Sequence, residues 1–201
     1  MFHFKSRRAE GEEHCLRVAV MGSAACGKTS IINQYLQQIF LNRYVVKVGE
    51  IHNTSLEVAG ETIDLDIWDT SGVYCFDAAR RKALQICDAF LLVYAMNDIV
   101  SFEKAIALQK DIIETRGPVT IVFAGTKADL KSSQWLEQQH HFSDFVREET
   151  CCTLHEVSAK TGSGISEVIV DIAKQWRKGQ KKPKELKVAK WLKRNVLCQN
   201  I

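Results

Sequence analysis

One segment constrains the fold of this chain more than any other. It reads Gly22-Ser23-Ala24-Ala25-Cys26-Gly27-Lys28-Thr29 and fits the pattern Gly, four variable residues, Gly, Lys, Ser/Thr. The apolar run Leu16–Met21 before it predicts a buried strand, and residues 30–36 after it carry apolar side chains at helical spacing. A glycine-rich loop between a strand and a helix predicts a nucleoside triphosphate site.

The residue types in this loop match the chemistry of phosphate binding. Gly22 and Gly27 let backbone N–H groups point at phosphate oxygens, and the helix N-terminus adds partial positive charge. Lys28 is expected to reach the β- and γ-phosphates, and the Thr29 hydroxyl is expected to bind Mg²⁺. We therefore predict that the whole segment from Gly22 to Ser30 contacts the nucleotide.

Strand-forming segments alternate with helical segments along the chain. The predicted strands are 16–21, 55–59, 62–68, 89–96, 119–124 and 153–157. Ser101 is the expected N-cap of a helix that runs to Arg116, and Ile165–Lys178 is the expected last helix. This order predicts an α/β P-loop NTPase fold with a doubly wound, mostly parallel six-stranded sheet. Because only Gly60-Glu61 separates the second and third strands, we expect one antiparallel edge strand.

Three further motifs follow three of the predicted strands. Asp69-Thr70-Ser71-Gly72 offers a carboxylate that could hold Mg²⁺ through water and a Gly72 N–H that could approach the γ-phosphate. Thr126-Lys127-Ala128-Asp129 and Ser158-Ala159-Lys160 follow the fifth and sixth strands. Because such sheets bind ligands at the carboxyl ends of their strands, we expect these motifs to meet the phosphate loop.

In these motifs and their order, residues 15–178 resemble a Ras-like small GTPase, with the Ras subfamily as the closest group. The resemblance implies GTP and GDP as ligands, Mg²⁺ as the metal, and a signalling switch as the function. It further implies effector proteins at the switch regions, an exchange factor and a GTPase-activating protein as partners, and a monomeric chain.

The resemblance also gives the base-binding residues their roles. Asp129 is implied to pair with the ring nitrogens of guanine, Lys127 to pack along the base, and Thr126 to brace the site. The Ala159 N–H, between Ser158 and Lys160, is implied to donate to the guanine carbonyl oxygen. Phe40, placed at the end of the first predicted helix, is implied to stack edge-on with the base.

The pairing at Asp129 predicts which nucleotides bind. Each unpaired buried group that adenine would leave costs about 1–3 kcal/mol, so GTP and GDP are expected to exclude ATP. Two other interpretations of these motifs explain less of the sequence. Asp129 alone could be a helix N-cap or turn residue. A P-loop kinase using ATP would share the first motif but would leave Asp129 and Ser158-Ala159-Lys160 unexplained.

The chain departs from the Ras pattern at three positions. The switch I threonine falls on Lys47, the catalytic glutamine on Val73, and the second phosphate-loop glycine on Ala24, where a methyl group crowds the space for a trans-acting arginine. Valine cannot orient an attacking water, and lysine cannot coordinate a cation. We therefore expect slow intrinsic hydrolysis and intact nucleotide affinity.

The residues left to act on the γ-phosphate are then Lys28, Thr29 and Gly72. One alternative is a binding module that holds GTP almost permanently. Another is a shifted switch I alignment, in which Thr54 replaces the missing threonine.

Charge is segregated along the chain. Nine Lys/Arg and one acid lie between Arg177 and Arg194, whereas the rest of the chain carries 18 basic and 23 acidic residues. We expect an N-terminal extension (1–14), a G domain (15–178) and a basic tail (179–201) that binds an anionic membrane surface. Cys198, fourth from the end, is a candidate for lipidation, although polar residues follow it. A disordered solubilising extension and a nuclear localisation run are the competing interpretations of the tail.

The remaining features indicate location and partners. Seven cysteines without a spaced framework predict reduced thiols and a cytoplasmic protein. The basic tail is expected to hold it at the inner face of a membrane, the plasma membrane first. Nucleic acid is not expected to bind, because no aromatic-rich surface accompanies the basic tail. The adjacent pair Cys151-Cys152, with His155, does not match a zinc knuckle. The basic segment 76–82 favours a solvated helical face, and effectors are expected at Phe76 and the edge of the second strand.

Overall fold

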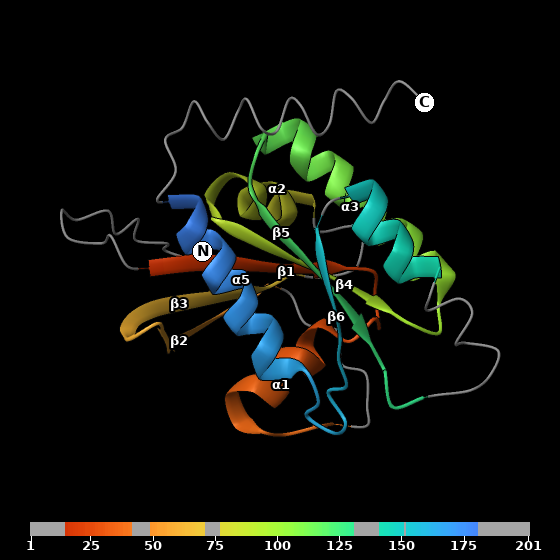
Figure 1. Cartoon of the computed structure of the whole chain (residues 1–201), viewed down its shortest axis with the longest axis horizontal. Helices are drawn as coiled ribbons and strands as arrows, with labels where there is room; N and C mark the ends of the chain where they lie inside the picture. Colours follow the sequence, from red (N-terminus) through yellow and green to blue (C-terminus); the bar gives the residue numbers. More distant parts are fainter. Residues whose placement is uncertain (1–14, 42–48, 71–76, 131–140, 151, 181–201) are drawn as a thin grey trace.

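The computed structural model describes residues 15–41, 49–70, 77–130, 141–150 and 152–180. Within these ranges the strands form one six-stranded sheet in the order β2-β3-β1-β4-β5-β6 (Figure 1). The strands are β1 (Cys15–Gly22), β2 (Glu50–Val58), β3 (Glu61–Asp69), β4 (Ala89–Ala95), β5 (Thr120–Thr126) and β6 (Thr153–Glu156). The helices are α1 (Lys28–Gln37), α2 (Asp77–Ile86), α3 (Ile99–Arg116) and α5 (Ile165–Gln180), with a π-helical turn η2 (Val146–Thr150).

The pairing of the strands confirms the predicted fold class. Neighbours β3, β1, β4, β5 and β6 run parallel, and β2 alone pairs antiparallel with β3. The loops after β1, β3, β5 and β6 therefore leave the sheet at the same edge, which is where the predicted motifs lie. None of the helices within the described ranges is long and apolar enough to cross a membrane.

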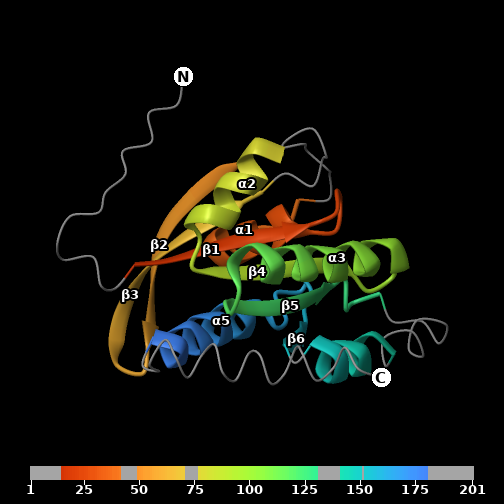
Figure 2. The ribbon, with the colours of Figure 1, turned by 90° about the horizontal axis from the view of Figure 1, so that it is seen from above.

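The alternation of side chains along the central strands gives the sheet two apolar faces. Leu16, Val18 and Val20 of β1 pack with buried residues of α1 and α5. Ala19 and Met21 point the other way and pack with α2 and α3. Figure 2 shows α5 on one side of the strands and α2 and α3 on the other. Central strands buried on both faces explain the continuous apolar runs in the sequence.

The β2–β3 hairpin differs from its prediction in two respects. β2 begins at Glu50 rather than residue 55. An edge strand tolerates polar residues, although these residues have a low intrinsic preference for strands. The turn consists of Ala59 and Gly60 rather than Gly60-Glu61. Both have positive φ (54° and 79°), the backbone that two-residue hairpin turns require.

The start of α3 also corrects the sequence analysis. The N-cap is Asp98 and not Ser101, because the Asp98 carboxylate accepts hydrogen bonds from the backbone N–H groups of Val100 and Ser101. Ser101 is instead fully buried, and its hydroxyl accepts from the Ala95 N–H and donates to the Asp98 carbonyl. Asp98 makes the better cap because it lies directly before α3, whereas Ser101 already lies inside the first turn of the helix.

Candidate nucleotide-binding site

The phosphate loop connects the end of β1 to the start of α1, as predicted. A Cβ at Gly22 would lie 2.1 Å from the Val93 carbonyl oxygen, so only glycine fits where the loop leaves the sheet. Gly27, the N-cap of α1, has no side chain to cap the helix, and the first turn of α1 holds no acidic residue. The first N–H groups of α1 are thus left for an anionic ligand.

Lys28 is buried inside this loop, with 6% of its surface exposed. Its ammonium donates to the carbonyl oxygens of Gly22 (3.1 Å) and Ser23 (2.7 Å). These two carbonyls hold the charge against the inner wall of the loop. Burial makes this charge costly without a partner, and a bound anion would supply one.

Cys26 occupies the buried side of the loop, with its sulfur 3.9 Å from the Lys28 ammonium. Burial raises the pKa of the Cys26 thiol above its usual value, and the charges of Lys28 and Lys127 partly offset this effect. The thiol is therefore neutral at physiological pH and adds no negative charge next to a phosphate site.

Thr29 and Asp69 bring two oxygen-bearing side chains together beside the loop. The Thr29 hydroxyl, in the first turn of α1, donates a 2.6 Å hydrogen bond to the Asp69 carboxylate at the end of β3. Asp69 is 3% exposed. A hydroxyl and a carboxylate are hard oxygen donors of the kind that Mg²⁺ prefers, so the donor set fits this metal.

Thr126 joins the base-binding motif to the phosphate loop. Its hydroxyl lies 2.6 Å from the Cys26 carbonyl oxygen and 3.1 Å from the Tyr94 carbonyl oxygen, within hydrogen-bonding reach of both. Lys127 follows with a left-handed backbone (φ 63°) that turns the chain at the end of β5. The loops after β1 and β5 are therefore held together by one side chain.

Ser158 joins the two predicted base-binding motifs to each other. Its buried hydroxyl donates a 2.6 Å hydrogen bond to the Asp129 carboxylate and accepts from the Thr161 N–H. One carboxylate oxygen of Asp129 is thereby fixed in place. Ala159 is buried beside Ser158, whereas Lys160 is exposed.

Two further residues from the sequence analysis, Phe40 and Thr54, lie after α1 and on β2. Phe40 is 39% exposed and lies beyond the end of α1 at Gln37, not within the helix end. Thr54 pairs with Leu65, four residues before Asp69 on β3, which is about 13 Å along the strand. This distance argues against Thr54 as the replacement for the switch I threonine. Gly72, Lys47, Val73 and Cys198 lie outside the described residues.

Thr70 is a positioning residue that the sequence analysis left without a role. It is buried, and its hydroxyl donates a 2.7 Å hydrogen bond to the Val20 carbonyl oxygen of β1. The bond fixes the chain directly after Asp69 against the strand that leads into the phosphate loop. The sequence feature that indicates this role is a small hydroxyl residue next to a predicted metal ligand.

A phosphate loop, a facing hydroxyl–carboxylate pair and a second pair of motifs at the same sheet edge define a P-loop nucleotide-binding domain. A model of the Ras family matches residues 17–178. The chain therefore belongs to the Ras family.

Individual relatives agree with this assignment. The chain is 28% identical to "GTP-binding protein Rhes" of Mus musculus over 162 residues, which is 76% of this chain and 61% of that protein. Human Rhes matches at the same identity and coverage. The human "Ras-related and estrogen-regulated growth inhibitor" is 27% identical over 167 residues, 81% of this chain and 82% of that protein. The chain thus spans about three-fifths of the length of the Rhes proteins.

Proposed function

We propose that this chain binds GTP and GDP with Mg²⁺ and acts as a signalling switch whose intrinsic GTP hydrolysis is slow. The observation that carries the proposal is the convergence of the phosphate loop, the Thr29–Asp69 pair and the Asp129–Ser158 pair, with Thr126 tying the first to the last. Membership of the Ras family and the name of the Rhes relatives support GTP as the ligand.

At the phosphate end, Lys28 and the N–H groups of residues 22–30 would bind the phosphate oxygens. Thr29 would bind Mg²⁺ directly and Asp69 would bind it through water. Held by these two side chains, the metal would supply positive charge next to the phosphates. Gly72 N–H is proposed to meet the γ-phosphate.

At the base end, the Asp129 carboxylate would accept two N–H bonds from guanine, with Ser158 fixing its orientation. The Ala159 N–H would donate to the guanine carbonyl oxygen, Lys127 would pack along the base, and Phe40 would stack against it. Lys160 is the last residue of this proposed base-binding motif. This arrangement favours guanine because adenine has no amino group at C2, no N–H at N1, and an amino group at C6 where guanine has its carbonyl.

Slow hydrolysis follows from three residue types. Val73 cannot orient water, Lys47 cannot bind the metal, and the methyl group of Ala24 occupies space that a trans-acting arginine would need. The same residues favour a second candidate function, in which the chain holds GTP persistently and signals as a binding module. Ala24 is exposed at the outer turn of the loop, which is consistent with that steric argument.

The proposal also covers the partners and the location of the protein. We propose that effectors bind the switch regions next to Phe76 and the β2 edge strand, and that an exchange factor and a GTPase-activating protein set the nucleotide state. The G domain would comprise residues 15–178 after the extension 1–14. The basic tail 179–201 would hold a monomeric chain at the cytoplasmic face of a membrane, with or without a lipid on Cys198.

One experiment separates the two candidates. Nucleotide is extracted from purified protein and identified, and single-turnover hydrolysis is then measured for the wild type and Val73→Gln. A switch is expected to copurify mainly with GDP or a mixture, and Val73→Gln should raise the hydrolysis rate at least about tenfold, because a positioned water is a large part of the catalysis. Almost pure GTP would favour the binding module. Absence of guanine nucleotide, together with no binding of added GDP, would reject both.

A further inference from the structure

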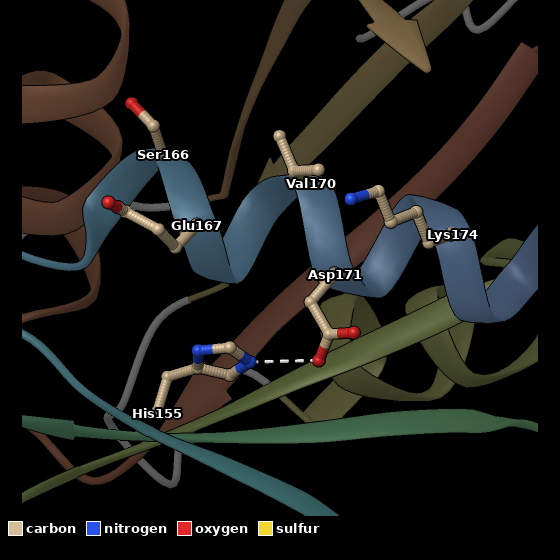
Figure 3. Close-up of a pocket in the computed structure, with 6 residues that line it drawn as sticks. All are labelled: His155, Ser166, Glu167, Val170, Asp171 and Lys174. Atoms are coloured by element: carbon tan, nitrogen blue, oxygen red, sulfur yellow. Dashed lines mark hydrogen bonds and ion pairs between the residues drawn. The ribbon is translucent and has the colours of Figure 1, made fainter. Parts of the chain in front are cut away.

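A polar cluster joins β6 to α5 on the side of the sheet away from α3. His155 of β6 lies 2.8 Å from the Asp171 carboxylate of α5 (Figure 3). The same carboxylate oxygen accepts from the Thr153 hydroxyl (3.0 Å) and the Gln175 amide (2.9 Å), and Gln175 also donates to Thr153 (2.6 Å). Three donors on one oxygen make Asp171 the centre of the cluster.

Both members of the ion pair are mostly sheltered from water. The side chain of His155 is 27% exposed and that of Asp171 is 28% exposed. Burial alone would raise the pKa of Asp171, but hydrogen bonds from His155, Thr153 and Gln175 lower it below its usual value. The ionised carboxylate is thus the form that this cluster stabilises.

The cluster flanks the loop that carries the proposed guanine contacts. The chain passes from β6 through residues 157–164, which include Ser158 and Ala159, into α5. At Gly164 a Cβ would lie 2.6 Å from the Glu156 carbonyl oxygen, so the end of β6 and the start of α5 are in close contact. A shift of α5 relative to β6 must therefore move the loop between them.

We infer that the His155–Asp171 pair is a positioning device that fixes this loop and slows the release of guanine nucleotide. The inference rests on the proposed function. His155 and Asp171 act through Ser158 and Ala159, because His155 lies on β6 before the loop and Asp171 lies on α5 after it. Loosening the pair would weaken the grip of the loop on Asp129 and on the base.

The His155–Asp171 pair also borders a shallow cavity. The charged groups of α5 that line the same shallow cavity, of about 380 Å³, are Asp171, Glu167 and Lys174. Glu156 points to the opposite face by strand alternation, and η2 packs on that opposite face through Val146.

The test is the rate at which labelled GDP leaves the full chain, with thermal unfolding measured on the same proteins. His155→Gln and Asp171→Asn are expected to release GDP about fivefold faster than the wild type, which corresponds to about 1 kcal/mol. His155→Gln is expected to keep an unfolding midpoint close to that of the wild type, because Thr153 and Gln175 still donate to Asp171. His141→Gln, at an exposed helical histidine, is the matched control and should follow the wild type.

Three outcomes would overturn the inference. The first is wild-type release by both variants. The second is faster release by His155→Gln only together with a loss of its thermal stability, which indicates a purely structural role. The third is an equal change in His141→Gln. If the wild type itself holds no GDP, the proposed function fails as well. GDP retention by the wild type with unaffected variants rejects this inference alone.

Discussion

The hydroxyl of Thr126 and the carbonyl oxygen of Cys26 lie 2.6 Å apart, although 100 positions separate the two residues in the chain. This contact connects the strand end that leads to Asp129 with the loop that surrounds Lys28. The phosphate loop and the strand end that leads to the proposed base-binding residues are therefore mechanically linked, and a change at one is expected to reach the other.

Thr126→Ala should weaken both functions of the site. The substitution leaves the buried carbonyls of Cys26 and Tyr94 without the hydroxyl, at a cost of about 1–3 kcal/mol in unfolding free energy. The affinity of the variant for GDP should also fall. Denaturant unfolding and GDP titration measure the two effects. Thr126→Ser, which keeps the hydroxyl, should lie close to the wild type, and equal losses in both variants would contradict the role of the hydrogen bond.

Lys28→Met should remove most nucleotide affinity while the chain stays folded. Loss of a buried, charge-assisted contact costs about 2–5 kcal/mol of binding free energy. That is at least about a 30-fold rise in the dissociation constant for GDP. Calorimetry checks the value, with Lys110→Met on the exposed side of α3 as the control. Unchanged affinity in Lys28→Met would exclude Lys28 from the phosphate site.

Asp129→Asn should change the preferred base from guanine to xanthine. The carboxylate offers two acceptors to the N–H donors of guanine, whereas the amide offers one acceptor and one donor, and xanthine carries a carbonyl where guanine carries its amino group. The Ser158 hydroxyl can still donate to the amide oxygen. Competition between GDP and XDP measures the change. Asp64→Asn, an exposed position on β3, should keep the preference for GDP.

Asp171→Asn should destabilise the fold in a pH-dependent manner. The pKa of Asp171 is lower in the folded chain than its ordinary value of 3.8. The ionised carboxylate therefore contributes stability at pH values above about 4, and this contribution is lost as the pH falls through the folded pKa. Unfolding by urea should separate the variant from the wild type at pH 7 and bring the two together near pH 3. An equal separation at both pH values would show that the charge of Asp171 is irrelevant.

The elements of the fold differ in how closely the amino-acid sequence predicts them. The central strands were predicted closely because burial on both faces leaves an unbroken apolar run, as in Ala89–Ala95. The start of β2 was missed because Glu50 is held in the sheet by pairing with Asp69, and nothing in its own neighbourhood signals a strand. The N-cap at Asp98 was missed because Ser101 matched the same local preference.

The same distinction between local and long-range features applies to the candidate site. The amino-acid sequence by itself determined the order of strands and helices, the phosphate loop and the motifs at the strand ends, since these depend on local periodicity and on residue types at fixed spacing. Only the tertiary structure decided that Thr126 reaches Cys26, that Ser158 orients Asp129 and that His155 pairs with Asp171. Those contacts join residues far apart in the chain, and their geometry exists only once the sheet and its helices have packed.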